Sequence, residues 1–198
     1  MARIDDYVAA KKLAAERLSR EKFETVSARS GFLKAGENAF EVPFLGKAYR
    51  VSYPEFDFTT EEAPIQEQVL ILHYMTAPEV SVSGNWIAYR EIPDASFYFS
   101  AFVKRAVDPL KKAFGRDVSL LEKAAKKLGG KSIDAGDAGF EFLLFPRVPI
   151  QLILWEGDEE FASEANILFD ETVGLLLSPE DIAWLAGMLV YRLMGLAK

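Results

Sequence analysis

Carboxylates crowd one short segment near the middle of the second half of the sequence. From Glu156 to Glu164 there are five acidic side chains in nine residues and no basic one. Like charges at this density repel, so the segment must be well solvated, paired with cations or bound to a metal ion. Gly157 and Asp158 predict a turn directly after an apolar run. Asp170 follows a second apolar run and could reach the same neighbourhood.

Three of these carboxylates, Asp158, Glu160 and Asp170, are candidate ligands for a hard cation such as Mg²⁺, Ca²⁺ or Mn²⁺. The spacing does not match an EF-hand, which needs alternating oxygen ligands and a glycine at its sixth position. A bound cation with one carboxylate as base would suit a metal-dependent, hydrolase-like enzyme. The alternatives are a solvated acidic turn and a turn neutralised by arginine or lysine.

Arg90 is the expected internal partner of the acidic turn. Strand alternation places Trp86, Ala88 and Arg90 on one face of a predicted strand. If Trp86 faces the core, Arg90 lies at the edge of that apolar face, where it requires a carboxylate. A bidentate pair of Arg90 with Asp158 or Glu160 meets this requirement.

His73 is the single histidine and lies in a strongly apolar segment, Val69–Met75. One interpretation makes it an axial ligand to a tetrapyrrole or a general base. The other makes it a half-buried, inert histidine with one hydrogen bond.

The sequence predicts an α+β fold with a small, mostly antiparallel sheet and segregated helices, forming a single domain over residues 1–198. The helix at residues 4–29 is expected at the periphery of this domain. Ser178 and Pro179 give the clearest helix start, an N-cap serine followed by a first-turn proline. The expected helices are 4–29, 64–76, 97–114, 118–128 and 179–196, and the expected strands are 40–45, 48–53, 86–89, 140–145 and 150–155.

Composition narrows the function mainly by exclusion. The 198 residues carry a net charge of −7, which argues against nucleic acid as the main partner. The chain has no cysteine, so disulfides, thiolate metal sites and cysteine nucleophiles are excluded. The longest uncharged run, residues 68–78, is far shorter than the ~20 residues of a membrane-spanning helix. We therefore expect a cytoplasmic protein with neither a nucleic-acid nor a membrane partner.

Charge is also distributed unevenly along the chain. Residues 104–131 contain nine basic and three acidic side chains, whereas residues 155–198 contain two basic and nine acidic side chains. Such oppositely charged segments can attract each other or face different partners. Two solvated helix faces, each of one sign, would give the same pattern.

Several segments together resemble a known family. They are Gly84–Pro93, Leu128–Gly130, Leu154–Phe161 and Ala165–Asp170. The sequence resembles, from Phe40 to Met194, prokaryotic proteins catalogued as a domain of unknown function and found largely in anaerobes. Some relatives resemble fusions to a cysteine-rich iron–sulfur domain of corrinoid proteins. The resemblance implies a link to corrinoid or redox chemistry but no catalytic residues, and this chain has no cysteine for such a module.

The sequence favours a non-catalytic ligand-binding or accessory module over an enzyme, with a small molecule or a protein as partner. The metal-dependent enzyme is one alternative. A structural domain, in which Arg90 and neighbouring lysines fix the C-terminal helix to the sheet, is the other. The expected ligand-binding residues are Arg90, Trp155, Asp158, Glu160, Asp170 and His73.

Overall fold

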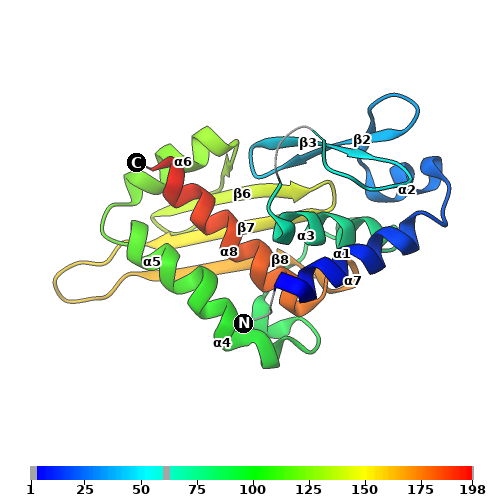
Figure 1. Cartoon of the computed structure of the whole chain (residues 1–198). Coiled ribbons are helices and arrows are strands. Elements are labelled where there is room, and N and C mark those ends of the chain that lie inside the picture. Colours follow the sequence, from blue (N-terminus) through cyan, green and yellow to red (C-terminus); the bar gives the residue numbers. More distant parts are fainter. Residues whose placement is uncertain (1–3, 60–62, 198) are drawn as a thin grey trace. The chain divides into compact units, whose positions relative to one another are not determined.

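The computed structural model describes residues 4–59 and 63–197, and its helices and strands are shown in Figure 1. The chain divides into two compact units, of which the first comprises Met1–Val80 with Leu175–Leu177 and the second comprises Ser81–Gly174 with Ser178–Lys198. Each unit combines helices with an antiparallel sheet, so the expected α+β class is confirmed. The expectation of a single domain with helix 4–29 at its periphery stays a prediction.

Among the residues described, the first unit contains three complete helices and a three-stranded sheet of order β1-β2-β3. These elements are α1 (Ile4–Leu18), α2 (Phe23–Ser30), β1 (Leu33–Lys34), β2 (Ala39–Phe44), β3 (Lys47–Ser52) and α3 (Ile65–Thr76). The predicted hairpin is confirmed, since Phe44 pairs with Lys47 across a turn in which Gly46 has a φ of 75°. Glycine adopts this left-handed conformation without steric cost.

The predicted helix at 4–29 is two helices. The backbone carbonyl of Glu21 accepts a hydrogen bond of 2.6 Å from the Tyr53 hydroxyl. The Glu21 side chain also pairs with Arg29, which donates a further hydrogen bond of 2.8 Å to the carbonyl of Met75. These tertiary contacts hold the segment between Leu18 and Phe23 out of the helix, and the helical pattern of the sequence does not encode them.

The second unit contains a five-stranded antiparallel sheet of order β4-β8-β7-β6-β5. The strands are β4 (Trp86–Ala88), β5 (Lys131–Ser132), β6 (Ala138–Phe145), β7 (Val148–Trp155) and β8 (Glu164–Asp170). The two central apolar runs are strands, as predicted. The sequence did not predict β8, although Ala165, Ile167 and Phe169 alternate as buried residues along it.

Helices of the second unit cover this sheet, and Figure 1 shows α8 in red running across the yellow and orange strands. They are η1 (Tyr89–Glu91), η2 (Ala95–Tyr98), α4 (Phe99–Phe102), the π-helical turn η3 (Val103–Val107), α5 (Asp108–Phe114), α6 (Val118–Leu128) and α8 (Pro179–Leu196). The short helix α7 (Val173–Leu176) is divided between the units, because its last two residues belong to the first. The predicted start of α8 is confirmed, because the Ser178 hydroxyl accepts a hydrogen bond of 3.2 Å from the N–H of Asp181.

A π-helical turn interrupts the predicted helix at 97–114. Pro109 has no backbone N–H, and its ring opposes the carbonyl four residues earlier, that of Arg105. The helix accommodates the proline by widening over Val103–Val107. Gly187 of α8 packs directly against this turn, where a Cβ atom would lie 3.1 Å from the Arg105 carbonyl oxygen.

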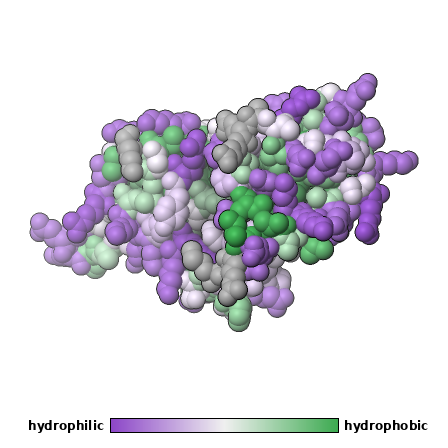
Figure 2. Space-filling model, viewed as in Figure 1, coloured by the Kyte–Doolittle hydropathy of each residue, from purple (hydrophilic) through white to green (hydrophobic). Residues whose placement is uncertain are grey.

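The surface is mainly hydrophilic on the face shown in Figure 2, including the projecting loop between β7 and β8 at the left. Among the residues described, no helix has both the length and the apolar character needed to cross a membrane.

Candidate functional site

The acidic loop, residues 156–163, connects β7 to β8 and is folded around Asp158. One carboxylate oxygen of Asp158 accepts hydrogen bonds from the N–H groups of Phe161 at 2.7 Å and Glu160 at 2.8 Å. The N–H of Asp158 donates to the carbonyl of Phe161 at 2.9 Å, which closes the turn. The Phe161 and Glu160 amides lower the pKa of Asp158. Asp158 is therefore a charged, turn-forming residue.

The acidic loop is anchored to the corner between α5 and α6. The N–H of Gly157 donates to the carbonyl of Gly115 at 2.8 Å. A Cβ atom on Gly115 would lie 2.2 Å from the Ser163 hydroxyl oxygen, and one on Gly157 would lie 2.5 Å from the Ser163 nitrogen. Neither position has room for a side chain. Two glycines thus allow the two backbones to approach closely.

A cation also meets the acidic segment at this corner. The Lys111 ammonium lies 3.5 Å from a carboxylate oxygen of Glu164, the first residue of β8. A turn neutralised by arginine or lysine was one of the alternatives for the acidic segment, and Lys111 is a lysine near the end of that segment. Lys111 lies in the basic stretch 104–131. That stretch is the feature of the sequence from which a cation near the acidic segment could have been predicted.

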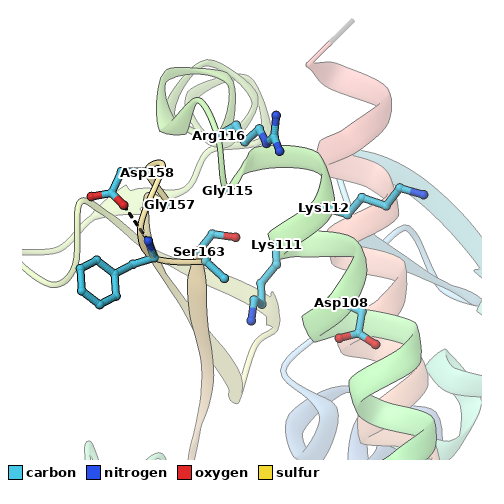
Figure 3. A pocket seen from close by; sticks show the side chains of 10 residues that line it. Asp108, Lys111, Lys112, Gly115, Arg116, Gly157, Asp158 and Ser163 are labelled. Atoms are coloured by element: carbon cyan, nitrogen blue, oxygen red, sulfur yellow. Dashed lines mark hydrogen bonds between the residues drawn. The ribbon is translucent and has the colours of Figure 1, made fainter.

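A pocket of about 430 Å³ lies between the corner and the loop. Figure 3 shows Lys111 and Ser163 side by side within it and Arg116 above them. The Asp158 side chain lies on the opposite side of the loop, and Lys112 points away from Lys111. The complete lining is Asp108, Lys111, Lys112, Gly115, Arg116, Gly157, Asp158, Phe161, Ala162 and Ser163.

The charges of this pocket are only partly compensated. Lys111 has the Glu164 partner, but no ion pair engages Lys112 or Arg116 within the described part of the chain. Besides these cations, the Asp108 carboxylate lines the pocket, whereas Figure 3 shows the Asp158 carboxylate directed to the other side of the loop. Two cations and a hydroxyl are suitable donors for a phosphate or carboxylate group.

Arg90 does not contact the acidic loop through an ion pair. The Glu91 carboxylate accepts the Ala88 N–H at 2.7 Å, and the chain leaves the strand for the turn η1 at this point. The guanidinium of Arg90 instead lies over the ring of Phe99, at 3.8 Å from its centroid. Within residues 4–59 and 63–197, no ion pair joins Arg90 to Asp158 or Glu160, so the expected pair is not formed.

Trp155 and Glu160 lie close to the pocket in sequence but outside its lining. Trp155 ends β7 opposite Glu164 and keeps 38% of its surface exposed. Glu160 is exposed and contributes its N–H to the Asp158 turn.

Asp170 is buried, with 1% of its surface exposed. It accepts hydrogen bonds from Ser83 N–H at 3.3 Å, Ser83 hydroxyl at 3.1 Å, Gly84 N–H at 2.7 Å, Thr172 N–H at 3.0 Å and Thr172 hydroxyl at 2.6 Å. Burial alone would favour the neutral acid, but the donors from Thr172, Gly84 and Ser83 outweigh it and lower the pKa of Asp170. None of these five hydrogen bonds comes from a cation. Asp170 is therefore a charged residue that anchors residues 83–85 through neutral donors.

The expected metal ligands do not share one site. Asp158 precedes β8 and Asp170 ends it, so a seven-residue strand, about 20 Å long, separates them. Over the described ranges, no group of three or more histidine, aspartate or glutamate side chains is arranged to hold a metal ion.

His73 belongs to the first unit, on α3, and is half-buried. It lines an open pocket of about 280 Å³ with Ala10, Leu13, Ala14, Arg17 and Thr76. This position is compatible with both interpretations of His73.

The first unit also contains a polar cluster of Lys47, Tyr49 and Glu67, whose side chains hydrogen-bond to one another. Lys47 donates to Glu67 at 3.1 Å and to the Tyr49 hydroxyl at 3.0 Å. Burial and the hydrogen bond with Glu67 raise the pKa of Tyr49. A phenol of raised pKa keeps its proton at neutral pH, and the Tyr49 hydroxyl donates that proton in a hydrogen bond to Glu67.

The comparisons with known proteins agree with the resemblance noted above. A family described as a domain of unknown function, DUF3786, matches residues 22–192. The chain belongs to this family. No curated protein and no solved structure matches the chain. The geometry of the site therefore carries the functional argument.

Proposed function

We propose that this member of the DUF3786 family is a non-catalytic ligand-binding module that binds an anionic small molecule at the pocket beside Gly115. The observation that carries the proposal is the placement of Lys111, Arg116 and the Ser163 hydroxyl around one cavity. Bound anions in proteins are held by charged and neutral N–H and O–H donors of this kind.

The packing of the site supports a fixed geometry. The Gly157–Gly115 hydrogen bond and the absence of space at both glycines hold the loop at one distance from the helix corner. Preorganised donors lose little conformational entropy when a ligand binds. A fixed site of this kind suits recognition of one ligand class.

The mechanism of binding follows from the charges. An anion entering the pocket replaces water around Lys111 and Arg116 and competes with Glu164 for the Lys111 ammonium. Since Glu164 is exposed and 3.5 Å from Lys111, this contact is weak and is readily exchanged for a ligand oxygen.

The experiment is isothermal titration of the full chain with pyrophosphate, phosphate and citrate, with cobalamin to test the corrinoid link that the family resemblance implies. We expect saturable binding of at least one anion, weakened by rising salt. The double variant Lys111→Gln, Arg116→Gln should weaken it at least about tenfold.

The matched control is Lys104→Gln, Lys123→Gln, which removes two exposed cations outside the pocket. It changes the net charge equally and should alter affinity by no more than about twofold. If no anion binds, or if both double variants weaken binding equally, the pocket is not an anion site. The cytoplasmic location and the lack of nucleic-acid and membrane partners are part of this proposal.

A further inference from the structure

A second pocket of the second unit, of about 250 Å³, has a different chemical character. Its walls are largely apolar and come from η1, the helix at 99–107 and strand β8. Its principal side chains are Arg90, Phe99, Phe102, Val103, Val107 and Ile167. This apolar pocket shares no residue with the anion pocket beside Gly115.

The apolar pocket exists because one strand is short. β4 pairs with β8 only along Leu168–Asp170. The chain then turns away at η1, where the Glu91 carboxylate holds the N–H of Ala88. Residues 164–167 of β8 consequently have β7 on one side and no described strand on the other.

The wall of the apolar pocket opposite β8 is the π-helical turn η3. Val103 and Val107, the two ends of the π-helical turn, both line the apolar pocket. Single π-helical turns inside α-helices occur frequently at functional sites. Here the turn results from Pro109, so the shape of this wall is built into the sequence.

The floor of the apolar pocket is formed by two stacked aromatic rings. Tyr89 and Phe102 stack with ring centroids 4.2 Å apart and an interplanar angle of 4°. The Tyr89 hydroxyl donates a hydrogen bond of 2.7 Å to the carbonyl of Pro179, which fixes the ring. Burial raises the pKa of Tyr89 to about 12, so this phenol is neutral at physiological pH.

Arg90 supplies one positive charge at the rim. Its guanidinium is stacked on Phe99, and no carboxylate pairs with it anywhere in the described sequence. The adjacent Glu91 carboxylate is engaged by the backbone of Ala88. Stacking leaves the in-plane N–H groups of an arginine able to bind a carboxylate in bidentate fashion.

We infer that the apolar pocket binds a small monocarboxylic acid with an apolar tail, whose carboxylate pairs with Arg90 and whose tail occupies the space above Phe102 and Ile167. The volume lies below the ~300–1,000 Å³ of sites for drug-sized ligands, so the ligand is of the size of phenylacetate. A strand-forming peptide would find only residues 164–167 to pair with, which disfavours it.

The test is titration of the full chain with phenylacetate and with its uncharged isostere, phenylacetamide, by calorimetry. We expect phenylacetate to bind and phenylacetamide to bind at least about tenfold more weakly. Arg90→Gln should weaken phenylacetate binding at least about tenfold, and Val103→Phe, which fills the pocket, should abolish it. Circular dichroism checks that both variants are folded.

The Lys111→Gln, Arg116→Gln variant separates this inference from the proposed function. It should bind phenylacetate normally, even if it no longer binds inorganic anions. Loss of phenylacetate binding in this variant would place the carboxylate in the anion pocket and overturn the inference. Equal affinity for acid and amide, unchanged affinity in Arg90→Gln, or tighter binding of a short strand-forming peptide than of phenylacetate would also overturn it.

Discussion

Replacing Asp170 with asparagine tests whether this carboxylate is a structural anchor. Each of its two oxygens accepts hydrogen bonds, and the shortest from a backbone amide comes from Gly84 at 2.7 Å. Asparagine has one carbonyl oxygen, so in either orientation its NH₂ group opposes a backbone N–H. The variant loses a charge-assisted bond and leaves a buried donor unsatisfied, at a cost of about 3 kcal/mol.

The assay is urea unfolding followed by tryptophan fluorescence. Trp86, Trp155 and Trp184 all belong to the second unit, so the signal reports on the unit that contains Asp170. With an m-value of about 2 kcal/mol/M, the loss lowers the urea midpoint by about 1.5 M. Glu171→Gln is the matched control, because Glu171 is exposed and its amide keeps an acceptor for Asn85, so its midpoint should be nearly unchanged.

Acid should reduce the difference between the parent and Asp170→Asn. The pKa of Asp170 is lowered below the ordinary value of 3.8. Its charge therefore contributes stability above pH 3.8, and that contribution is lost as the pH falls through the lowered pKa of the native state. A parent and variant of equal stability at pH 7, or a difference that appears only with added Mg²⁺ and vanishes with chelator, would refute the anchoring role.

Two further substitutions test the packing of the second unit. Gly115→Ala should destabilise it by about 1–3 kcal/mol, because the new Cβ would lie 2.2 Å from the Ser163 hydroxyl oxygen; Gly195→Ala, where nothing lies within 4 Å, should be neutral or slightly stabilising by urea unfolding. Tyr89→Phe should cost about 1 kcal/mol by removing the bond to the Pro179 carbonyl. An ultraviolet titration should show the loss of a phenol with a pKa of about 12, and loss of an earlier-titrating phenol would contradict this assignment.

The elements that sequence analysis predicted correctly have local signals. The hairpin at Gly46 and the start of α8 at Ser178 depend on residues within a few positions of the turn or cap. β8 was not predicted, although its buried residues alternate, because the apolar run that precedes Asp170 is short. The break in helix 4–29 depends on Tyr53, which is distant in sequence.

The candidate site was predicted only in part, because the contacts that form it join segments that are distant in sequence. The cation that the structure places at the end of the acidic segment is Lys111, which lies 3.5 Å from Glu164 at the start of β8. Arg90 was expected to pair with the acidic loop by extrapolating strand alternation past Ala88, where the strand ends. The Gly157–Gly115 contact joins segments more than forty residues apart, and local patterns do not encode such contacts.

The most direct measurement for the anion pocket is a titration of isotope-labelled full-length protein with pyrophosphate, followed by amide chemical shifts. Binding in this pocket should shift the resonances of Gly115, Arg116, Gly157 and Ser163 together along one saturable curve. The same resonances should stay in place in the Lys111→Gln, Arg116→Gln variant. Shifts confined to the exposed lysines of α6, or no saturable shift at any concentration, would contradict an anion site between Lys111, Arg116 and Ser163.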